Sequence, residues 1–221
     1  MNLLFISLAP VFIIAFYVWF RDKYEKEPIG LLIRALLIGA VTTIPVIFIE
    51  RGLFAVGAAF SFGPFWDAFA VAGLVEESFK FLAFYLFIWR NVNFNEKFDG
   101  IVYAVFIALG FAGVENILYV AEGGVQVALT RAITAVPAHA LFGVVMGYHL
   151  GLAKFYPKMR TSQTWQAFMW PVLAHGFYDF CLLSGNAFLL SVFVPYVIFL
   201  WINGSRKMKA LSELSLFKND K

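Results

Sequence analysis

The chemistry of this sequence starts at Glu76, Glu77 and Lys80, because these three ionisable residues lie within an otherwise apolar run. Burying an ionised group without a partner costs several kcal/mol or more, so a chain that keeps three of them together has a use for them. Residues three and four positions apart share a helix face. Lys80 can therefore neutralise one glutamate and leave the other to act as a base.

Later apolar runs carry further acid–base groups, namely Glu115 followed by Asn116, then His139, and then His175 with Asp179 one turn later. An Asp beside a His can orient the imidazole and raise its basicity. No nucleophilic Ser or Cys stands among these groups, so the pattern indicates an activated water. Either a carboxylate takes the proton of that water, or a metal such as zinc activates it, with Glu76, His139 and His175 as the expected ligands.

The composition indicates a membrane protein, since 62% of the residues are hydrophobic and only 14% are charged, against about 25% in soluble domains. The net charge of +3 is not gathered into basic blocks outside the membrane ends, which argues against a nucleic-acid partner. Cys181 is the single cysteine, so disulfides within the chain are excluded. The first apolar run has no Lys or Arg before it and no small-residue cleavage site after it, which favours a retained span over a removed signal peptide.

Runs of about 20 apolar residues predict an all-α, polytopic helix bundle with about seven transmembrane helices. The predicted spans are 3–20, 31–49, 66–89, 101–120, 132–153, 165–183 and 187–202. Residues 53–65 are apolar but rich in glycine and too short to span, so we expect a loop or a re-entrant segment there. The expected organisation is one transmembrane domain, residues 1–205, followed by a basic cytoplasmic tail, residues 206–221.

The placement of Lys and Arg sets the orientation of the bundle. Of the 17 such residues, only Arg51 and Arg131 fall in loops on one side, while Arg34 and Lys80 fall within spans. All the others lie on the opposite side, which the positive-inside rule assigns to the cytoplasm. We therefore expect the N-terminus outside and the C-terminus in the cytoplasm.

This orientation brings the acid–base residues of four different spans to similar depths. At ~1.5 Å per residue they lie ~6–15 Å from the outer ends of their spans, a set made of Glu76, Glu115, His139, His175 and Asp179. His149 instead falls ~26 Å deep, as expected for an interfacial histidine. Gly143 and Gly147 follow His139 at four-residue spacing and predict a close helix contact. The agreement in depth predicts one shared site in the outer half of the bilayer.

Two other classes of function stay open at this point. Buried Glu and His residues also relay protons in proton-coupled transporters, although transporters usually show repeats with broken helices, and no repeat is visible here. In a non-catalytic membrane scaffold, the same polar residues would only hold helices together.

The motifs also resemble a known family. They are Glu76-Glu77-x-x-Lys80, Phe111-x-x-x-Glu115-Asn116, His139-x-x-x-Gly143 and His175-x-x-x-Asp179. This order is similar to that of the PrsW intramembrane proteases, and the segments at 22–28 and 98–103 resemble that family too. The resemblance implies a multi-pass peptidase of the bacterial cell membrane that makes the first, extracytoplasmic-side cut in a membrane-anchored anti-sigma factor under envelope stress.

The wider superfamily includes CAAX prenyl endopeptidases, in which a Glu and a His are held to activate water. This sequence departs from their pattern, because Lys80 stands one residue before their Arg and Glu115 replaces their second-motif His. The resemblance therefore implies Glu76 or Glu77 as the base, with three co-bases or metal ligands, His139, His175 and Glu115. Asp179 would orient His175 or, together with Asn116, help to hold the oxyanion.

Overall fold

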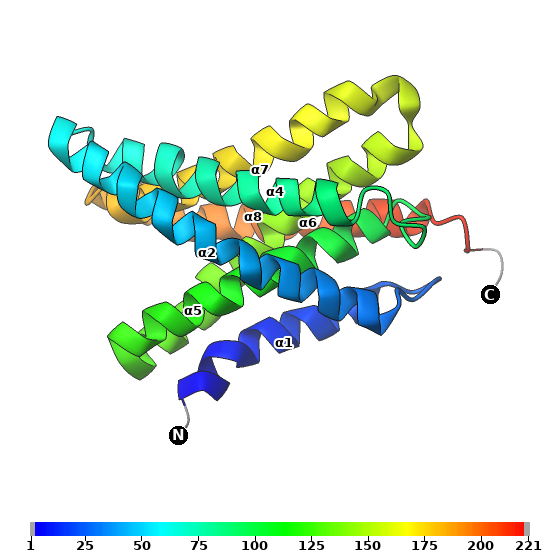
Figure 1. The fold of residues 1–221 in the computed structure, drawn as a ribbon, viewed down its shortest axis with the longest axis horizontal. Coiled ribbons are helices and arrows are strands. Elements are labelled where there is room, and N and C mark those ends of the chain that lie inside the picture. Colours follow the sequence, from blue (N-terminus) through cyan, green and yellow to red (C-terminus); the bar gives the residue numbers. More distant parts are fainter. Residues whose placement is uncertain (1–2, 219–221) are drawn as a thin grey trace.

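The computed structural model describes residues 3–218, and all the regular secondary structure in this range is helical (Figure 1). The helices are α1 (Leu3–Arg21), α2 (Ile29–Phe60), α3 (Gly63–Phe65), η1 (Trp66–Glu76), α4 (Glu77–Phe87), α5 (Asp99–Ile133), α6 (Ala135–Phe155), η2 (Pro157–Met159), α7 (Arg160–Leu183) and α8 (Ala187–Glu213). Within this range 4 helical stretches are long and apolar enough to cross a membrane, Leu3–Arg21, Ile29–Phe60, Asp99–Phe155 and Ala187–Glu213. The all-α prediction is confirmed, while the count of about seven spans and the orientation stay predictions.

The core of the bundle is the pair α5 and α6, against which α1, α2 and α7 pack (Figure 1). Every residue from Asp99 to Gly113 in α5 is buried. The expected glycine contact below His139 is present, since a Cβ on Gly147 would lie 2.2 Å from the carbonyl oxygen of Gly100 in α5. This close approach brings the inward-facing side chains of α5 and α6 into one layer.

The expectation of a loop or re-entrant segment at 53–65 is wrong for most of that segment, because α2 continues as a helix to Phe60. A tertiary contact explains the difference. The indole nitrogen of Trp66 donates to the carbonyl of Leu53 at 3.1 Å, and a Cβ on Gly57 would lie 2.6 Å from the Trp66 ring. Glycine here admits the tryptophan, and the chain turns only at Ser61, whose φ is 57°.

The segment predicted to hold Glu76, Glu77 and Lys80 is helical as expected, but its first part is a π-helix, η1, with 11 residues. Glu76 is the last residue of η1 and Glu77 is the first residue of α4. The glutamate pair therefore lies where a wide helix meets an ordinary one, a feature frequent at functional sites.

Two further helices, α5 and α8, continue well beyond their predicted spans. In α5 the chain breaks at Gly124, whose φ of 69° suits glycine, and helical structure then continues to Ile133 instead of forming a loop. At the other end of the chain, α8 extends past Ile202 to Glu213, so the predicted boundary at residue 206 lies within this helix.

The end of the bundle that is predicted to be cytoplasmic gathers buried carboxyl groups from the segment after α1 and the start of α5. Asp22, Glu27 and Asp99 are all buried, and the hydroxyl of Tyr103 donates to Glu27. Burial raises the pKa of Asp22 to about 7 and that of Glu27 to about 10. These acids therefore hold protons more tightly in the folded protein than in the unfolded chain.

We predict that Asp22→Asn reduces the pH dependence of stability. Ionising Asp22 in the folded state is unfavourable, so its contribution lowers stability as pH rises from its ordinary pKa of 3.8 to about 7. The melting temperature of the purified protein should fall less in the variant than in wild type between pH 5 and 8, and ~1 kcal/mol corresponds to ~2–4 °C for a chain of this size. Glu213→Gln, at an exposed position, is the control. Parallel curves for Asp22→Asn and wild type would contradict the prediction.

Candidate active site

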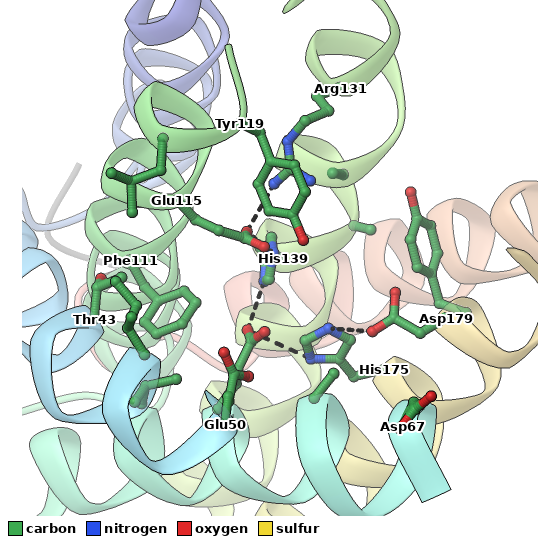
Figure 2. A pocket seen from close by; sticks show the side chains of 18 of the residues that line it. Thr43, Glu50, Asp67, Phe111, Glu115, Tyr119, Arg131, His139, His175 and Asp179 are labelled. Carbon is green, nitrogen blue, oxygen red and sulfur yellow. Dashed lines mark hydrogen bonds and ion pairs between the residues drawn. The ribbon is translucent and has the colours of Figure 1, made fainter. Parts of the chain in front are cut away.

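A cavity of about 430 Å³ lies between α2, η1, α5, α6 and α7 (Figure 2). The residues that line it include five of those predicted from sequence, Glu76, Glu115, His139, His175 and Asp179. Five residues from four helical elements thus meet at one cavity, as their predicted depths required. The remaining members of the predicted set are Glu77, Lys80 and Asn116.

Lys80 is the central cation of the site. Its Nζ lies 3.1 Å from Glu76 Oε2 and 2.8 Å from Glu77 Oε1, and 4.2 Å above the ring of Phe111. All three charged side chains are buried. The expectation that Lys80 neutralises a single glutamate was too narrow, because the ammonium contacts both.

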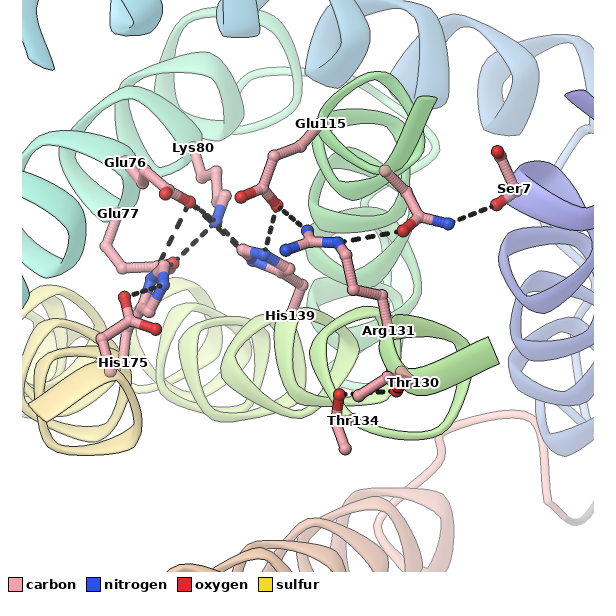
Figure 3. Close-up of polar contacts among 12 residues, drawn as sticks. Ser7, Glu76, Glu77, Lys80, Glu115, Thr130, Arg131, Thr134, His139 and His175 are labelled. Carbon is pink, nitrogen blue, oxygen red and sulfur yellow. Dashed lines mark hydrogen bonds and ion pairs between the residues drawn. The ribbon is translucent and has the colours of Figure 1, made fainter. Parts of the chain in front are cut away.

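His139 joins this cation to Glu115. Its Nδ1 lies 2.9 Å from Lys80 Nζ and its Nε2 lies 2.9 Å from Glu115 Oε2 (Figure 3). An ammonium can only donate a hydrogen bond, so Nδ1 accepts one. The proton of the neutral ring therefore lies on Nε2, and this N–H donates a hydrogen bond to Glu115. The contacts therefore define one tautomer of His139, with the Nδ1 lone pair toward Lys80.

His175 lies between two carboxylates. Its Nδ1 is 3.0 Å from Glu77 Oε1, and its Nε2 is 3.3 Å from Asp179 Oδ2. The ring stacks on Phe142 with the centroids 4.8 Å apart. The predicted pairing of Asp179 with His175 is thus present, and two partners together with a ring contact fix the orientation of the imidazole.

Asn116 does not face the cavity. Its Nδ2 donates to the backbone oxygen of Ser7 at 2.8 Å, and its Oδ1 accepts from Arg131 Nε at 3.0 Å. Both ends of the amide are therefore engaged, one with Ser7 of α1 and the other with Arg131. His149 also lies elsewhere, 2.7 Å from Gln163 Oε1.

Sequence reasoning missed Arg131 as a site residue. Its Nη2 lies 2.8 Å from Glu115 Oε2, and its guanidinium carbon lies 4.0 Å above the ring of Tyr119. Arg131 falls in a predicted outer loop, because the predicted spans on either side of it are 101–120 and 132–153. A glycine pair, Gly123 and Gly124, was the available signal, since it lies about midway between Glu115 and Arg131 and predicts a hairpin that brings them together.

Glu50 was missed for a related reason. The predicted second span ended at Ile49, whereas α2 continues and carries Glu50 into the wall of the cavity (Figure 2). Because a loop was expected near Leu53, this additional carboxylate was not placed on a helix that faces the cavity.

Four side chains of the cluster could hold a metal ion, because Glu76, Glu77, His139 and His175 each offer a ligand atom and these atoms lie within 4.8 Å of one another. Imidazole and carboxylate donors suit zinc. Lys80 Nζ lies within hydrogen-bond distance of three of the four side chains. The ammonium and a metal ion would therefore compete for the same oxygen and nitrogen atoms. The predicted ligand set of Glu76, His139 and His175 lacked Glu77. Glu115, which the resemblance also offered as a ligand, is not among the four.

Comparison with known proteins identifies the family. Residues 27–202 match the family described as PrsW family intramembrane metalloprotease. The chain belongs to this PrsW family. Protease PrsW of Oceanobacillus iheyensis is 37% identical over 214 residues, which cover 96% of this chain and 97% of the relative. Protease PrsW of Bacillus subtilis is 35% identical over 215 residues (96% of each), and that of Clostridioides difficile is 34% identical over 208 residues (91% and 87%). No solved structure matches the chain.

The predicted resemblance to PrsW proteases is thus confirmed. The protein is a multi-pass membrane peptidase of bacteria, with a buried Glu/His cluster. PrsW membership decides against the transporter and scaffold alternatives. A membrane protease of this family also implies a membrane protein as substrate.

We predict that Lys80→Met increases the stabilisation of the protein by zinc. The substitution removes the competing ammonium and leaves two buried glutamates without their cation, so a bound metal ion gains both donors and charge compensation. Added zinc should raise the melting temperature of Lys80→Met by several degrees more than that of wild type, and elemental analysis should find more zinc in the purified variant. Lys209→Met, at an exposed position, is the control. Equal zinc effects in Lys80→Met and wild type would contradict competition.

Proposed function

We propose that this PrsW-family peptidase makes the first, extracytoplasmic-side cut in a membrane-anchored anti-sigma factor and so starts the release of a sigma factor under envelope stress. The observation that carries the proposal is the meeting of Glu76, His139 and His175 at one cavity between helices. The predicted orientation supports a cut near the outer side of the membrane. The four-motif resemblance supports the choice of substrate.

Glu76 is the side chain that we propose as the general base. It lines the cavity, whereas Glu77 is fully buried and held by both Lys80 and His175. Glu76 would take a proton from water as the water oxygen bonds to the scissile carbonyl carbon. The same carboxyl group would then return the proton to the amine nitrogen as the C–N bond breaks.

The other residues of the cluster hold this base in position. Lys80 compensates the charge of both glutamates, and Glu77 and Asp179 fix the ring of His175 from opposite sides. Glu76 Oε2 lies 3.9 Å from the nearest nitrogen of each histidine, so a modest movement would let either imidazole exchange a proton with it. Preorganised charges of this kind lower the cost of moving a proton inside the membrane.

If zinc binds, Glu76, Glu77, His139 and His175 would hold it. The ion would then supply a Lewis acid that makes a bound water acidic near neutral pH. Binding of the ion would require the Lys80 ammonium to move away from the three side chains that it contacts, Glu76, Glu77 and His139.

We predict that Glu76→Gln abolishes first-site cleavage. Glutamine keeps the size of the side chain but cannot take a proton, and loss of a general base typically costs about 10²–10⁴-fold in rate. Cleavage would be followed as the appearance of the shortened form of a tagged anti-sigma factor in cells that lack the native protease. Glu77→Gln should also reduce cleavage, because it weakens the hold on Lys80 and His175.

Glu213→Gln, at an exposed position near the end of α8, is the matched control and should cleave at the wild-type rate. The amount of inserted protein is measured for each variant. Normal cleavage by Glu76→Gln at wild-type protein levels would overturn the assignment of the base. Absence of cleavage by the wild-type protein would overturn the choice of substrate.

A further inference from the structure

The outer end of α5 holds a cation that none of the four motifs contains. Arg131 is 15% exposed at its side chain and lines the cavity beside Glu115 (Figure 2). We propose that Arg131 is a positioning residue of the peptidase site, which fixes the orientation of the His139 ring through Glu115. The consequence for catalysis rests on the proposed function, whereas the consequence for His139 can be measured without it.

The backbone places Arg131 for this contact. Because α5 breaks at Gly124, the segment that follows turns back and carries Arg131 to a residue 16 positions earlier. The guanidinium then meets three groups of the preceding helix segment at once, Glu115 and Asn116 by hydrogen bonds and Tyr119 by its ring face. A planar fork of donors suits this combination, and a lysine could not reproduce it.

A single oxygen connects Arg131 to the catalytic cluster. Glu115 Oε2 lies 2.8 Å from Arg131 Nη2 and 2.9 Å from His139 Nε2. Arg131 therefore holds the same oxygen atom that accepts the hydrogen bond from His139 Nε2, and its charge compensates the carboxylate. Without Arg131, Glu115 would keep one of these two partners and could rotate toward the cavity.

The orientation of His139 matters because its other nitrogen faces the cluster. Nδ1 lies 2.9 Å from Lys80 Nζ, and Lys80 holds both glutamates. The chain of contacts from Arg131 thus passes through Glu115 and His139 to Lys80 (Figure 3). Supporting partners of this kind typically contribute about 10–100-fold in activity or metal affinity.

A purely structural role is the alternative, in which Arg131 only closes the hairpin around Gly124. A double-mutant cycle tests in the cleavage assay whether Arg131 acts through Glu115, and ¹⁵N-histidine spectra distinguish positioning of His139 from closure of the hairpin alone. If Arg131 acts through Glu115, Arg131→Met should lower kcat about 10–100-fold with little change in KM, and the double variant Arg131→Met/Glu115→Gln should be no worse than Glu115→Gln alone. Arg131→Lys should lie between wild type and Arg131→Met, and the exposed Arg206→Met should match wild type. Additive losses would overturn the proposal.

The second readout needs no cleavage. The chain has 3 histidines, so ¹⁵N-histidine NMR of the purified protein can resolve His139, His149 and His175. Wild type should show His139 protonated at Nε2, and Arg131→Met should shift the ¹⁵Nε2 signal of His139 as its hydrogen bond to Glu115 weakens. His149, bonded to Gln163, is the internal reference and should not change.

The two experiments test the role of Arg131 and the proposed substrate separately. An unchanged His139 signal in folded Arg131→Met would overturn the positioning role, and Arg131→Lys provides the same comparison if Arg131→Met does not fold. If wild type does not cleave the anti-sigma factor, the proposed substrate fails, and the histidine spectra still decide the role of Arg131.

Discussion

The structure depends on the compensation of buried charge around Lys80. Its ammonium holds Glu76 and Glu77 and meets the lone pair of His139, in a layer with almost no exposed surface. A buried ion that loses its partner costs several kcal/mol, and the surrounding hydrocarbon of a bilayer offers no water in its place. The helices must therefore approach closely enough for these short contacts to form. The cluster in turn links the helices, because displacing α4 from α6 would break the buried contact between Lys80 and His139.

Small residues and one unusual helix make this approach possible. A Cβ on Gly39 would lie 1.9 Å from the carbonyl oxygen of Ile107, and one on Gly73 would lie 2.9 Å from the backbone nitrogen of Gly176. The first contact lets α2 pack closely against α5. The second lets η1 pack closely against α7 at Gly176, the residue next to His175. Since η1 ends at Glu76, the wide π-helix and the glycine contact together determine where the glutamate pair faces the histidines.

The sequence was sufficient to identify the residues within each span but not the contacts between spans. Four-residue spacing correctly paired Lys80 with Glu76 and His175 with Asp179, because such pairs depend only on helix geometry. The contact of His139 with Lys80 depends on how α4 and α6 pack, which periodicity does not specify. Arg131 and Glu50 were missed because the predicted helices ended too early, at residues 120 and 49, whereas α5 and α2 continue past them. At Gly57 a tryptophan ring stabilises the helix, and at Gly124 a positive φ turns the chain back, so the same residue type has opposite effects.

The contacts of His139 determine which of its two ring nitrogens carries the proton. One neighbour, Lys80, can only donate a hydrogen bond, and the other, ionised Glu115, can only accept one. The proton of the neutral ring is therefore confined to Nε2 while both neighbours stay in place, and Nδ1 presents its lone pair to the Lys80 ammonium. A metal ion in place of the ammonium would meet the same lone pair, so the orientation imposed by Glu115 serves either cation. Because Arg131 holds the Glu115 oxygen in turn, two cations at opposite ends of His139 hold one ring in one state.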